Sequence, residues 1–325
     1  HQDLHRVDRR QRQMCIRDSP TSDRLYDVKI ENNYLDQVKN QFDAFDLLDI
    51  EYKPFLRFHI TDLFNKIFDS KIQNFVKETL QDRQRGAFII GPEVMDPNKY
   101  DANFLVKVST ALTHLIGTPN FDSMAGNYYA RFEVKHTDSS DSYLRKAYKK
   151  LDLHTDGTYV KEKTDWLLMT KMKEENANGG ESVLLHLDDW EDLEDFIKDP
   201  VAKQNFIWGS PRSKNIDYKI EHPVFSKDIN EKPTISYIDQ FPEPSSLEQG
   251  LFLNRLSDSL ENSKNHIVFK LPPGYSIFSN NHFLLHGRKA FQPSPNMSRE
   301  LLLSLIHISE PTRLLSISYA VFCLK

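Results

Sequence analysis

Three histidines each precede an aspartate by two positions, a spacing that could serve a metal site. Side chains at positions i and i+2 lie on one face of a strand or turn, so an imidazole and a carboxylate can reach the same ion. A second, distant histidine would complete the two-histidine, one-carboxylate set that holds non-haem iron. The spacing alone is weak evidence, because about one such triplet is expected by chance. The triplets are His136-Thr137-Asp138, His154-Thr155-Asp156 and His186-Leu187-Asp188.

Two of the triplets have a simpler structural interpretation. His186 alternates within an apolar strand, and Asp188 with Glu191 has the spacing of a capping box, so Asp188 is expected to cap a helix that starts there. His136 opens the polar stretch TDSSDS, which favours a solvated loop.

His154 and Asp156 are the best-placed ligand pair. They follow an alternating strand pattern at 150–153 and precede a glycine and a strong apolar strand. A third ligand is expected far downstream, where the segment NNHFLLHGR offers two histidines. We expect His286, which lies where the chain leaves an apolar run, to be that ligand, and His282 to occupy a more exposed turn.

The elements that must position these residues are mainly short strands. Helices are predicted over Phe55–Leu80 with a break near Ser70, around Leu105–Leu115 with Gly117 at the C′ position, from Asp188, and over the segment carrying Leu253, Leu256 and Leu260. Strands are predicted at Ala87–Ile90, Tyr128–Lys135, Trp166–Met172, Ser182–Leu187, Phe206–Trp208, Thr234–Ile238, Ile267–Leu271 and Tyr275–Phe278. Many short strands with flanking helices predict a jelly roll.

Composition excludes several classes of protein. The chain has 325 residues with 39% hydrophobic and 11% aromatic residues, which is a globular profile. Its net charge of −5 provides no excess of positive charge for binding the phosphates of nucleic acid. No apolar run reaches the roughly 18 residues of a membrane helix. No composition shift marks an internal boundary, so a single domain is expected.

Both ends of the chain differ from its body. The stretches QMCIRDS and LIHISEPTRLLSISYAVFCLK resemble translated sequencing-adapter read-through, and they carry the only cysteines, Cys15 and Cys323. We therefore expect residues 1–19 and 304–325 to be artefactual tails around a domain at 20–303. The tails hold seven basic and four acidic residues, which leaves a cysteine-free body with a net charge of −8. Such a body fits a reducing cytoplasm.

Several longer motifs resemble one known family. HTDG, GGESVLLHLDDW, YIDQF and NNHFLLHGR, with NYYARF, SDSYLR and HLIGTPNFD upstream, are similar to the carbon-starvation-induced glutarate 2-hydroxylases. These are iron(II)- and 2-oxoglutarate-dependent oxygenases related to taurine dioxygenase and clavaminate synthase, and the resemblance covers about Phe45 to Leu303. It implies a double-stranded β-helix and a cytoplasmic, tetrameric enzyme of glutarate catabolism. Its substrates would be small dicarboxylates and dioxygen.

The same resemblance assigns roles to residues. His154, Asp156 and His286 would bind iron, and Arg299, 13 residues past His286, would hold the distal carboxylate of 2-oxoglutarate. Ser182, in the Gly-Gly-x-Ser segment, matches a hydroxyl that helps to hold that carboxylate.

One position departs from the family pattern. Leu303 stands where the family has another arginine, four residues beyond Arg299, and this puts a full set of dicarboxylate contacts in doubt. Arg288 is equally compatible with the site and with a structural ion pair.

Three alternatives remain open at the level of sequence. The same oxygenase chemistry could act on another small carboxylate or a sulfonate. The chain could also be a non-catalytic jelly-roll binder of a small molecule. A zinc hydrolase is a third possibility, although the HExxH motif is absent.

Overall fold

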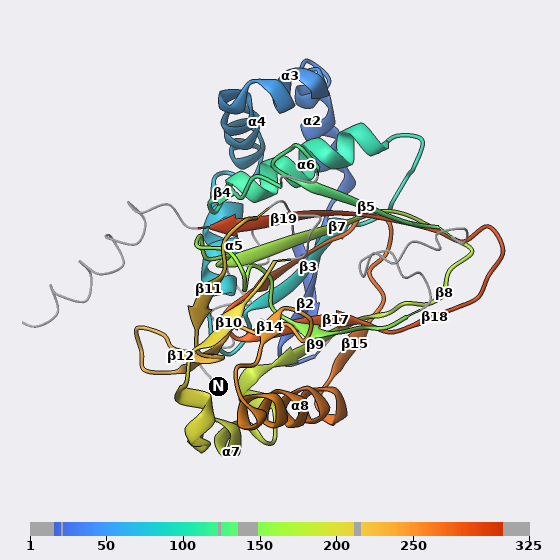
Figure 1. The fold of residues 1–325 in the computed structure, drawn as a ribbon. Coiled ribbons are helices and arrows are strands. Elements are labelled where there is room, and N and C mark those ends of the chain that lie inside the picture. Colours follow the sequence, from blue (N-terminus) through green and yellow to red (C-terminus); the bar gives the residue numbers. More distant parts are fainter. Residues whose placement is uncertain (1–15, 21, 123–124, 136–148, 211–215, 308–325) are drawn as a thin grey trace, which may run out of the picture.

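Two facing β-sheets with helices on their outer sides form the protein (Figure 1). The structure is a computed structural model that describes residues 16–20, 22–122, 125–135, 149–210 and 216–307. The predicted helix-flanked, mainly β jelly-roll architecture is confirmed.

The major sheet has eight strands in the described residues, mostly antiparallel; β2 and β3 pair in parallel. Its order is β1 (Ile16–Pro20), β2 (Leu25–Ile30), β3 (Ala87–Pro92), β16 (Ser276–Asn280), β7 (Trp166–Glu175), β19 (Ser298–His307) and β4 (Thr118–Pro119), with β5 (Ala130–Lys135) also paired to β19.

The minor sheet contains four strands: β15 (Ile267–Phe269), β9 (Ser182–His186), β17 (Leu284–Arg288) and β6 (Leu151–His154). Smaller pairings join β10 (Phe206–Trp208) to β11 (Ile220–His222) and β14 (Pro242–Glu243), β12 (Phe225–Lys227) to β13 (Pro233–Ile235), and β8 (Asn178–Gly179) to β18 (Phe291–Gln292).

Helices cover the outer side of each sheet. The major sheet carries α2 (Asn32–Phe42), α3 (Leu47–Tyr52), α4 (Pro54–Ile67), α5 (Lys71–Gln81) and α6 (Ala102–His114), and the minor sheet carries α7 (Leu193–Lys198) and α8 (Leu247–Asn262) (Figure 1). Short 3₁₀ turns are η2 (Leu187–Asp189) and η3 (Pro200–Lys203). None of the helices in these described segments is long and apolar enough to cross a membrane.

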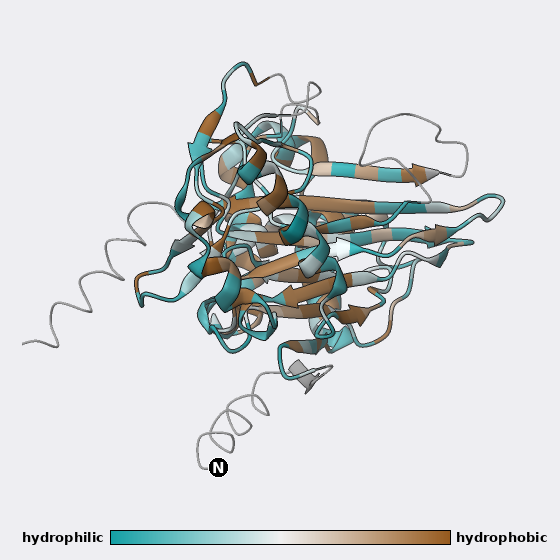
Figure 2. Cartoon of the chain, turned by 60° about the horizontal axis from the view of Figure 1, so that its bottom comes forward, coloured by the Kyte–Doolittle hydropathy of each residue, from teal (hydrophilic) through white to brown (hydrophobic). Residues whose placement is uncertain are grey.

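Two apolar cores follow from this layering. One lies between the α2–α6 helices and the outer face of the major sheet, where Phe88 and Phe278 stack with ring centroids 5.0 Å apart. The other joins the facing sides of both sheets to α7 and α8, and includes Ile277 of the major sheet and Leu284 of the minor sheet. Hydropathy colouring shows the same distribution, with apolar residues concentrated in the central strands (Figure 2).

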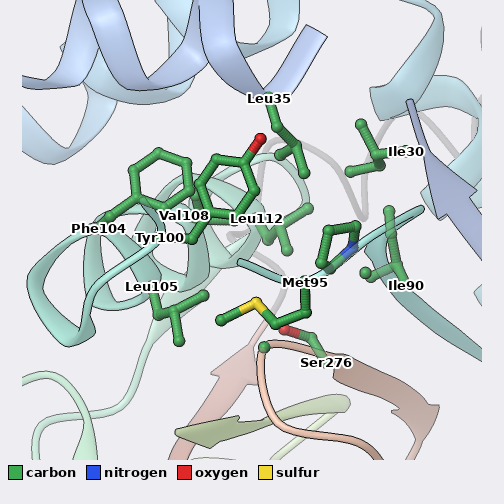
Figure 3. A pocket seen from close by; sticks show the side chains of 13 residues that line it. Ile30, Leu35, Ile90, Met95, Tyr100, Phe104, Leu105, Val108, Leu112 and Ser276 are labelled. Carbon is green, nitrogen blue, oxygen red and sulfur yellow. The ribbon is translucent and has the colours of Figure 1, made fainter. Parts of the chain in front are cut away.

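A small gap remains inside the first core. Leu35, Tyr100, Leu105 and Met95 point into a cavity of about 20 Å³ beside β3 (Figure 3). That volume holds one water molecule at most, so the cavity is a packing defect and not a ligand site.

The predicted break in the first helix is confirmed. α4 ends at Ile67 and α5 begins at Lys71. Between them Asp69 and Ser70 adopt left-handed backbone angles, with φ of 52° and 59°. A helix cannot continue through two left-handed residues, so the amphipathic pattern is folded into two helices.

Two local predictions were wrong. Asp188 caps no α-helix: its carboxylate binds Arg83 at 2.6 Å and 3.0 Å, and α7 begins only at Leu193. Gly117 is not the left-handed C′ residue of α6, because α6 ends at His114 with Leu115 as its C-cap. Gly117 instead allows close strand contact, since a Cβ there would lie 2.4 Å from the carbonyl oxygen of His307.

The last strand runs past the expected boundary at Leu303. β19 continues to His307, and Ile306 is fully buried against the helix-side core. At the other end, β1 pairs with β2. The division into a 20–303 domain and two tails therefore stays a prediction, and both cysteines lie outside the described residues.

Candidate active site

His154 and His286 are direct cross-strand partners in the minor sheet. His154 ends β6 and His286 lies in the middle of β17, so antiparallel pairing places both rings on one face. Their ring centroids are 4.2 Å apart. Asp156 follows in the loop after β6, and its Oδ2 lies 3.3 Å from Nε2 of His286. One ligand atom from each of the three residues falls within 4.8 Å of the others.

A hydrogen bond orients the ring of the first histidine of this triad. Nδ1 of His154 donates to the backbone carbonyl of Asp152 at 2.7 Å. A carbonyl can only accept, so Nδ1 carries the proton and Nε2 keeps its lone pair for a metal. Burial, and then the charge of His286, lower the pKa of His154 to about 4, which leaves its imidazole neutral at pH 7.

Asn281 fixes the loop that carries the carboxylate. Its side-chain oxygen accepts from the backbone N–H of Asp156 at 2.9 Å, and its amide nitrogen donates to the carbonyls of Asp156 and Thr164 at 2.8 Å and 2.9 Å. Gly157 supplies the next turn with φ of 74°, where a Cβ would lie 2.4 Å from Oγ1 of Thr164. The loop of Asp156 is thus held by a residue that precedes β17, the strand that carries His286.

The donor set of this triad fits iron(II). Two imidazole nitrogens and one carboxylate oxygen converge from one side, which leaves the other side of an ion open for small ligands. Nδ1 of His286 is buried without a hydrogen-bond partner among the described residues.

The other two triplets take no part in this arrangement. His186 is fully buried, its Nε2 contacts the carbonyl of Arg83 at 2.7 Å, and its Nδ1 accepts from the N–H of Asp188 at 3.0 Å. That geometry agrees with the structural interpretation of His186. The triplet that begins at His136 lies outside the described residues. His282 is partly exposed and bonds Asp165 at 2.9 Å.

Arg299 lies on the inward face of the major sheet with its side chain only 3% exposed. Its Nε and Nη1 are buried and have no hydrogen-bond partner among the described residues. Nε lies 3.7 Å from a carboxylate oxygen of Glu174, and the guanidinium sits over the ring of Phe291, 5.4 Å from its centroid. Burial lowers the pKa of Arg299 to about 10, so the group stays cationic at neutral pH.

Ser182 and Arg288 face each other across β9 and β17. Arg288 lies two residues beyond His286, so alternation puts both on the same side of the sheet. Arg288 donates to the carbonyl of Lys149 at 2.7 Å and also covers the ring of Phe291, 4.8 Å from its centroid. The two arginines therefore approach one aromatic ring from opposite sheets.

A cavity of about 90 Å³ reaches the turn that follows Asp156, although none of the three triad residues is among those that line it. Gly157, which follows Asp156, lines one side together with Tyr159, and Leu303 and Leu305 of β19 line another. Leu303, the position where the resemblance predicts an arginine, thus contributes an apolar side chain to the wall of this cavity.

Sequence reasoning missed the residues that support the ligands. Asn281 stands in a polar pair between two buried strands, which is a signal that could have been noticed. Lys171 and Glu174, both on β7 beside Arg299, gave no signal, because a lysine in a strand is ordinarily solvated.

Comparison with known proteins decides the family. The family model described as CsiD matches residues 14–305. The chain belongs to the CsiD family. Among curated relatives, the glutarate 2-hydroxylase of Klebsiella pneumoniae (strain 342) is 45% identical over 287 residues, covering 88% of each chain. The glutarate 2-hydroxylase of Citrobacter koseri is 43% identical over 295 residues, covering 91% of this chain and 90% of the relative.

Solved structures support the same fold for this CsiD-family chain. An asparagine oxygenase in complex with Fe(II), 2S,3S-3-hydroxyasparagine and succinate matches with a TM-score of 0.68 at 13% identity, covering 86% of this chain and 93% of the other. The non-heme iron oxygenase OrfP in complex with Fe and alpha-ketoglutaric acid matches with a TM-score of 0.64 at 14% identity, covering 90% and 96%.

Proposed function

We propose that this protein is an iron(II)- and 2-oxoglutarate-dependent dioxygenase that hydroxylates glutarate to 2-hydroxyglutarate, with release of succinate and carbon dioxide. The observation that carries the proposal is the convergence of His154, Asp156 and His286, with ligand atoms within 4.8 Å of one another. Relatives at 43–45% identity named glutarate 2-hydroxylase support the substrate. Structural neighbours with iron, succinate or alpha-ketoglutaric acid support the cofactor and cosubstrate.

His154, Asp156 and His286 would hold the metal, and iron(II) would supply the activation of dioxygen that couples decarboxylation of 2-oxoglutarate to C–H hydroxylation. The neutral imidazole of His154 is already in the tautomer that ligation needs. Asn281 holds the Asp156 loop so that little reorganisation is required on binding.

Arg299 would bind the distal carboxylate of 2-oxoglutarate. Its buried guanidinium, with two nitrogens that lack hydrogen bonds, needs an acceptor, and a carboxylate fits its planar fork. Ser182, opposite Arg288 on the same side of the minor sheet as His286, would donate its hydroxyl to the same carboxylate.

The 90 Å³ cavity beside Gly157 would receive the substrate. Leu303 in its wall favours a second candidate within the same chemistry, a carboxylate that is less anionic than glutarate. A substrate panel separates the two candidates: glutarate should give the highest kcat/KM if the first holds, and a monocarboxylate of similar length if the second does.

Turnover tests the proposed function. Protein loaded anaerobically with iron(II) and supplied with oxygen, 2-oxoglutarate and glutarate should form succinate and 2-hydroxyglutarate in equal amounts. His286→Ala should abolish both products, whereas the matched variant His266→Ala should retain them, because the ring of His266 contacts the carbonyl of Leu260 on α8 and is no part of the triad. Succinate formation from 2-oxoglutarate at the same rate with and without glutarate or another candidate substrate would contradict the hydroxylase assignment.

We further propose that the active form is a cytoplasmic homotetramer whose partners are small molecules, with neither nucleic acid nor membrane involved. The body's net charge of −8 disfavours nucleic acid. Light scattering of the purified protein would test the tetramer.

A further inference from the structure

Three charged side chains are buried together where β7 meets β19. The side chains of Lys171, Glu174 and Arg299 are 1%, 7% and 3% exposed. Oε2 of Glu174 accepts a hydrogen bond from Nζ of Lys171 and lies 3.7 Å from Nε of Arg299. The carboxylate therefore stands between the two cations and contacts both.

The strand register explains how Lys171 and Glu174 can meet although they are three positions apart on β7, a spacing that puts side chains on opposite faces of a regular strand. Arg299 pairs with Glu174, but the ladder shifts between Glu300 and Leu301, so that Leu301 pairs with Lys171. This bulge inserts one extra residue into β7, so Lys171 and Glu174, which are three positions apart, point to the same face of the sheet.

Two cations and one carboxylate leave this buried cluster with one unit of positive charge. Without Lys171, Glu174 and Arg299 would neutralise each other. A buried net charge is costly unless an ion of opposite sign completes it. Nε and Nη1 of Arg299, which lack hydrogen-bond partners among the described residues, mark where the missing anion belongs.

Other charged groups near the cluster do not replace that anion. Nζ of Lys270 lies 3.3 Å from the second oxygen of Glu174, but its side chain is 61% exposed and its charge is screened by water. Arg288 approaches from the minor sheet across Phe291 and adds further positive charge. The surroundings thus reinforce the excess of positive charge.

We propose that Lys171 sets the charge of the cosubstrate site: its ammonium neutralises Glu174 and so leaves the guanidinium of Arg299 available to the distal carboxylate of 2-oxoglutarate. Lys171 is a positioning residue, because it acts through Glu174 and Arg299. The proposal rests on the proposed function, since it takes Arg299 as the anchor of 2-oxoglutarate.

A pair of substitutions tests this charge balance. Lys171→Met shortens the unbranched side chain by only its terminal atom but removes the excess charge, and should weaken binding of 2-oxoglutarate by about tenfold or more. Glu174→Gln raises the excess charge and should not weaken binding. The double variant Lys171→Met/Glu174→Gln restores one net positive charge and should bind 2-oxoglutarate within about threefold of the unmodified protein. A merely structural role would instead make the double variant at least as poor as Lys171→Met.

The readout is the Kd of 2-oxoglutarate, titrated calorimetrically into iron(II)-loaded protein without oxygen, together with kcat at saturating 2-oxoglutarate. We expect Lys171→Met to change Kd and to leave kcat within about threefold. Lys173→Met is the matched control: it lies on the same strand, its exposed ammonium pairs with Glu175 at 2.9 Å, and its loss should leave Kd unchanged. Thermal unfolding of each variant verifies that it folds.

The outcomes separate this proposal from the proposed function. If the unmodified protein neither binds 2-oxoglutarate nor turns over, the proposed function fails. If it does both and Lys171→Met binds 2-oxoglutarate equally well, or the double variant is not rescued, the role of Lys171 is overturned. Weakened binding of glutarate alone would overturn it as well.

Discussion

At the scale of single residues, supporting groups decide whether the ligand set can form. Asn281 makes three hydrogen bonds that close the Asp156 loop onto the chain before β17. Asn281→Ala should therefore weaken iron(II) binding by about 10- to 100-fold, the usual loss on removal of an outer-shell partner. Metal titration measures this effect.

Asn178→Ala is the control for that prediction, because Asn178 is exposed on β8 and its side chain donates to that of Gln292 at 2.7 Å. If Asn281→Ala bound iron(II) as tightly as Asn178→Ala and the unmodified protein, the Asp156 loop would hold its shape without Asn281.

Leu303 places an uncharged side chain in the wall of the cavity that reaches Gly157. Leu303→Arg would place a cation in the wall, so we expect the KM for glutarate to fall by about tenfold because the distal carboxylate gains a charged partner. The KM for 2-oxoglutarate should not change. Leu303→Met, which adds no charge, should behave like the unmodified protein, and an improved KM in that variant would assign the effect to shape.

Lys171 makes cosubstrate binding sensitive to pH. Burial, and then the charge of Arg299, lower the pKa of Lys171 to about 8. Burial by itself raises the pKa of Glu174, but the hydrogen bond and the charge interaction with Lys171 outweigh burial and lower this pKa. Glu174 therefore remains ionised. Arg299 stays cationic, and Tyr275, whose pKa burial raises, stays neutral. Lys270 and Arg288 are the other charged groups that approach this cluster.

Raising the pH above 8 therefore removes one positive charge, and affinity for 2-oxoglutarate should fall by a factor that approaches about tenfold per pH unit. Titrations between pH 7 and 9 measure the slope. In Lys171→Met the slope should vanish; a slope that persists there would assign the titration to another group.

At the scale of elements, local patterns were predictable and long-range partners were not. The two-residue spacing of His154 and Asp156 and the strand before His286 can be seen in the sequence, because they depend on alternation alone. The pairing of β6 with β17 cannot be seen in the sequence, since it is fixed by the packing of both sheets. The spacing of Asp188 and Glu191 predicted a helix cap that does not form. Arg83, far away in sequence, offers Asp188 a stronger partner than a helix N-terminus does.

Helix α6 offers a test of how local capping supports the major sheet. Asp101 accepts the N–H of Phe104 at 2.8 Å, and α6 packs on the helix-side core. Asp101→Ala should cost about 1 kcal/mol of stability and lower Tm by about 2 °C, whereas Asp101→Asn keeps the cap and should cost less. Both variants should keep full activity. An equal loss in the two variants would mean that the charge of Asp101, and not its cap, matters.

At the scale of the whole molecule, both substrates are anions and the body carries −8. Binding must therefore come from local cations, and Arg299 and Lys171 are described cations buried together where β7 meets β19. Composition predicted that local cations were needed, and the resemblance pointed to Arg299. Lys171 could not be predicted, because only the fold shows that its ammonium is buried beside a carboxylate.

Isotope labelling tests the central claim most directly. The proposed reaction splits dioxygen, placing one atom in succinate and the other in the new hydroxyl group of the product. Turnover under ¹⁸O₂ with glutarate and 2-oxoglutarate should give succinate with one ¹⁸O atom and 2-hydroxyglutarate labelled at its hydroxyl. Products that carry oxygen from water alone would contradict the account of His154, Asp156 and His286 as the centre of a dioxygenase.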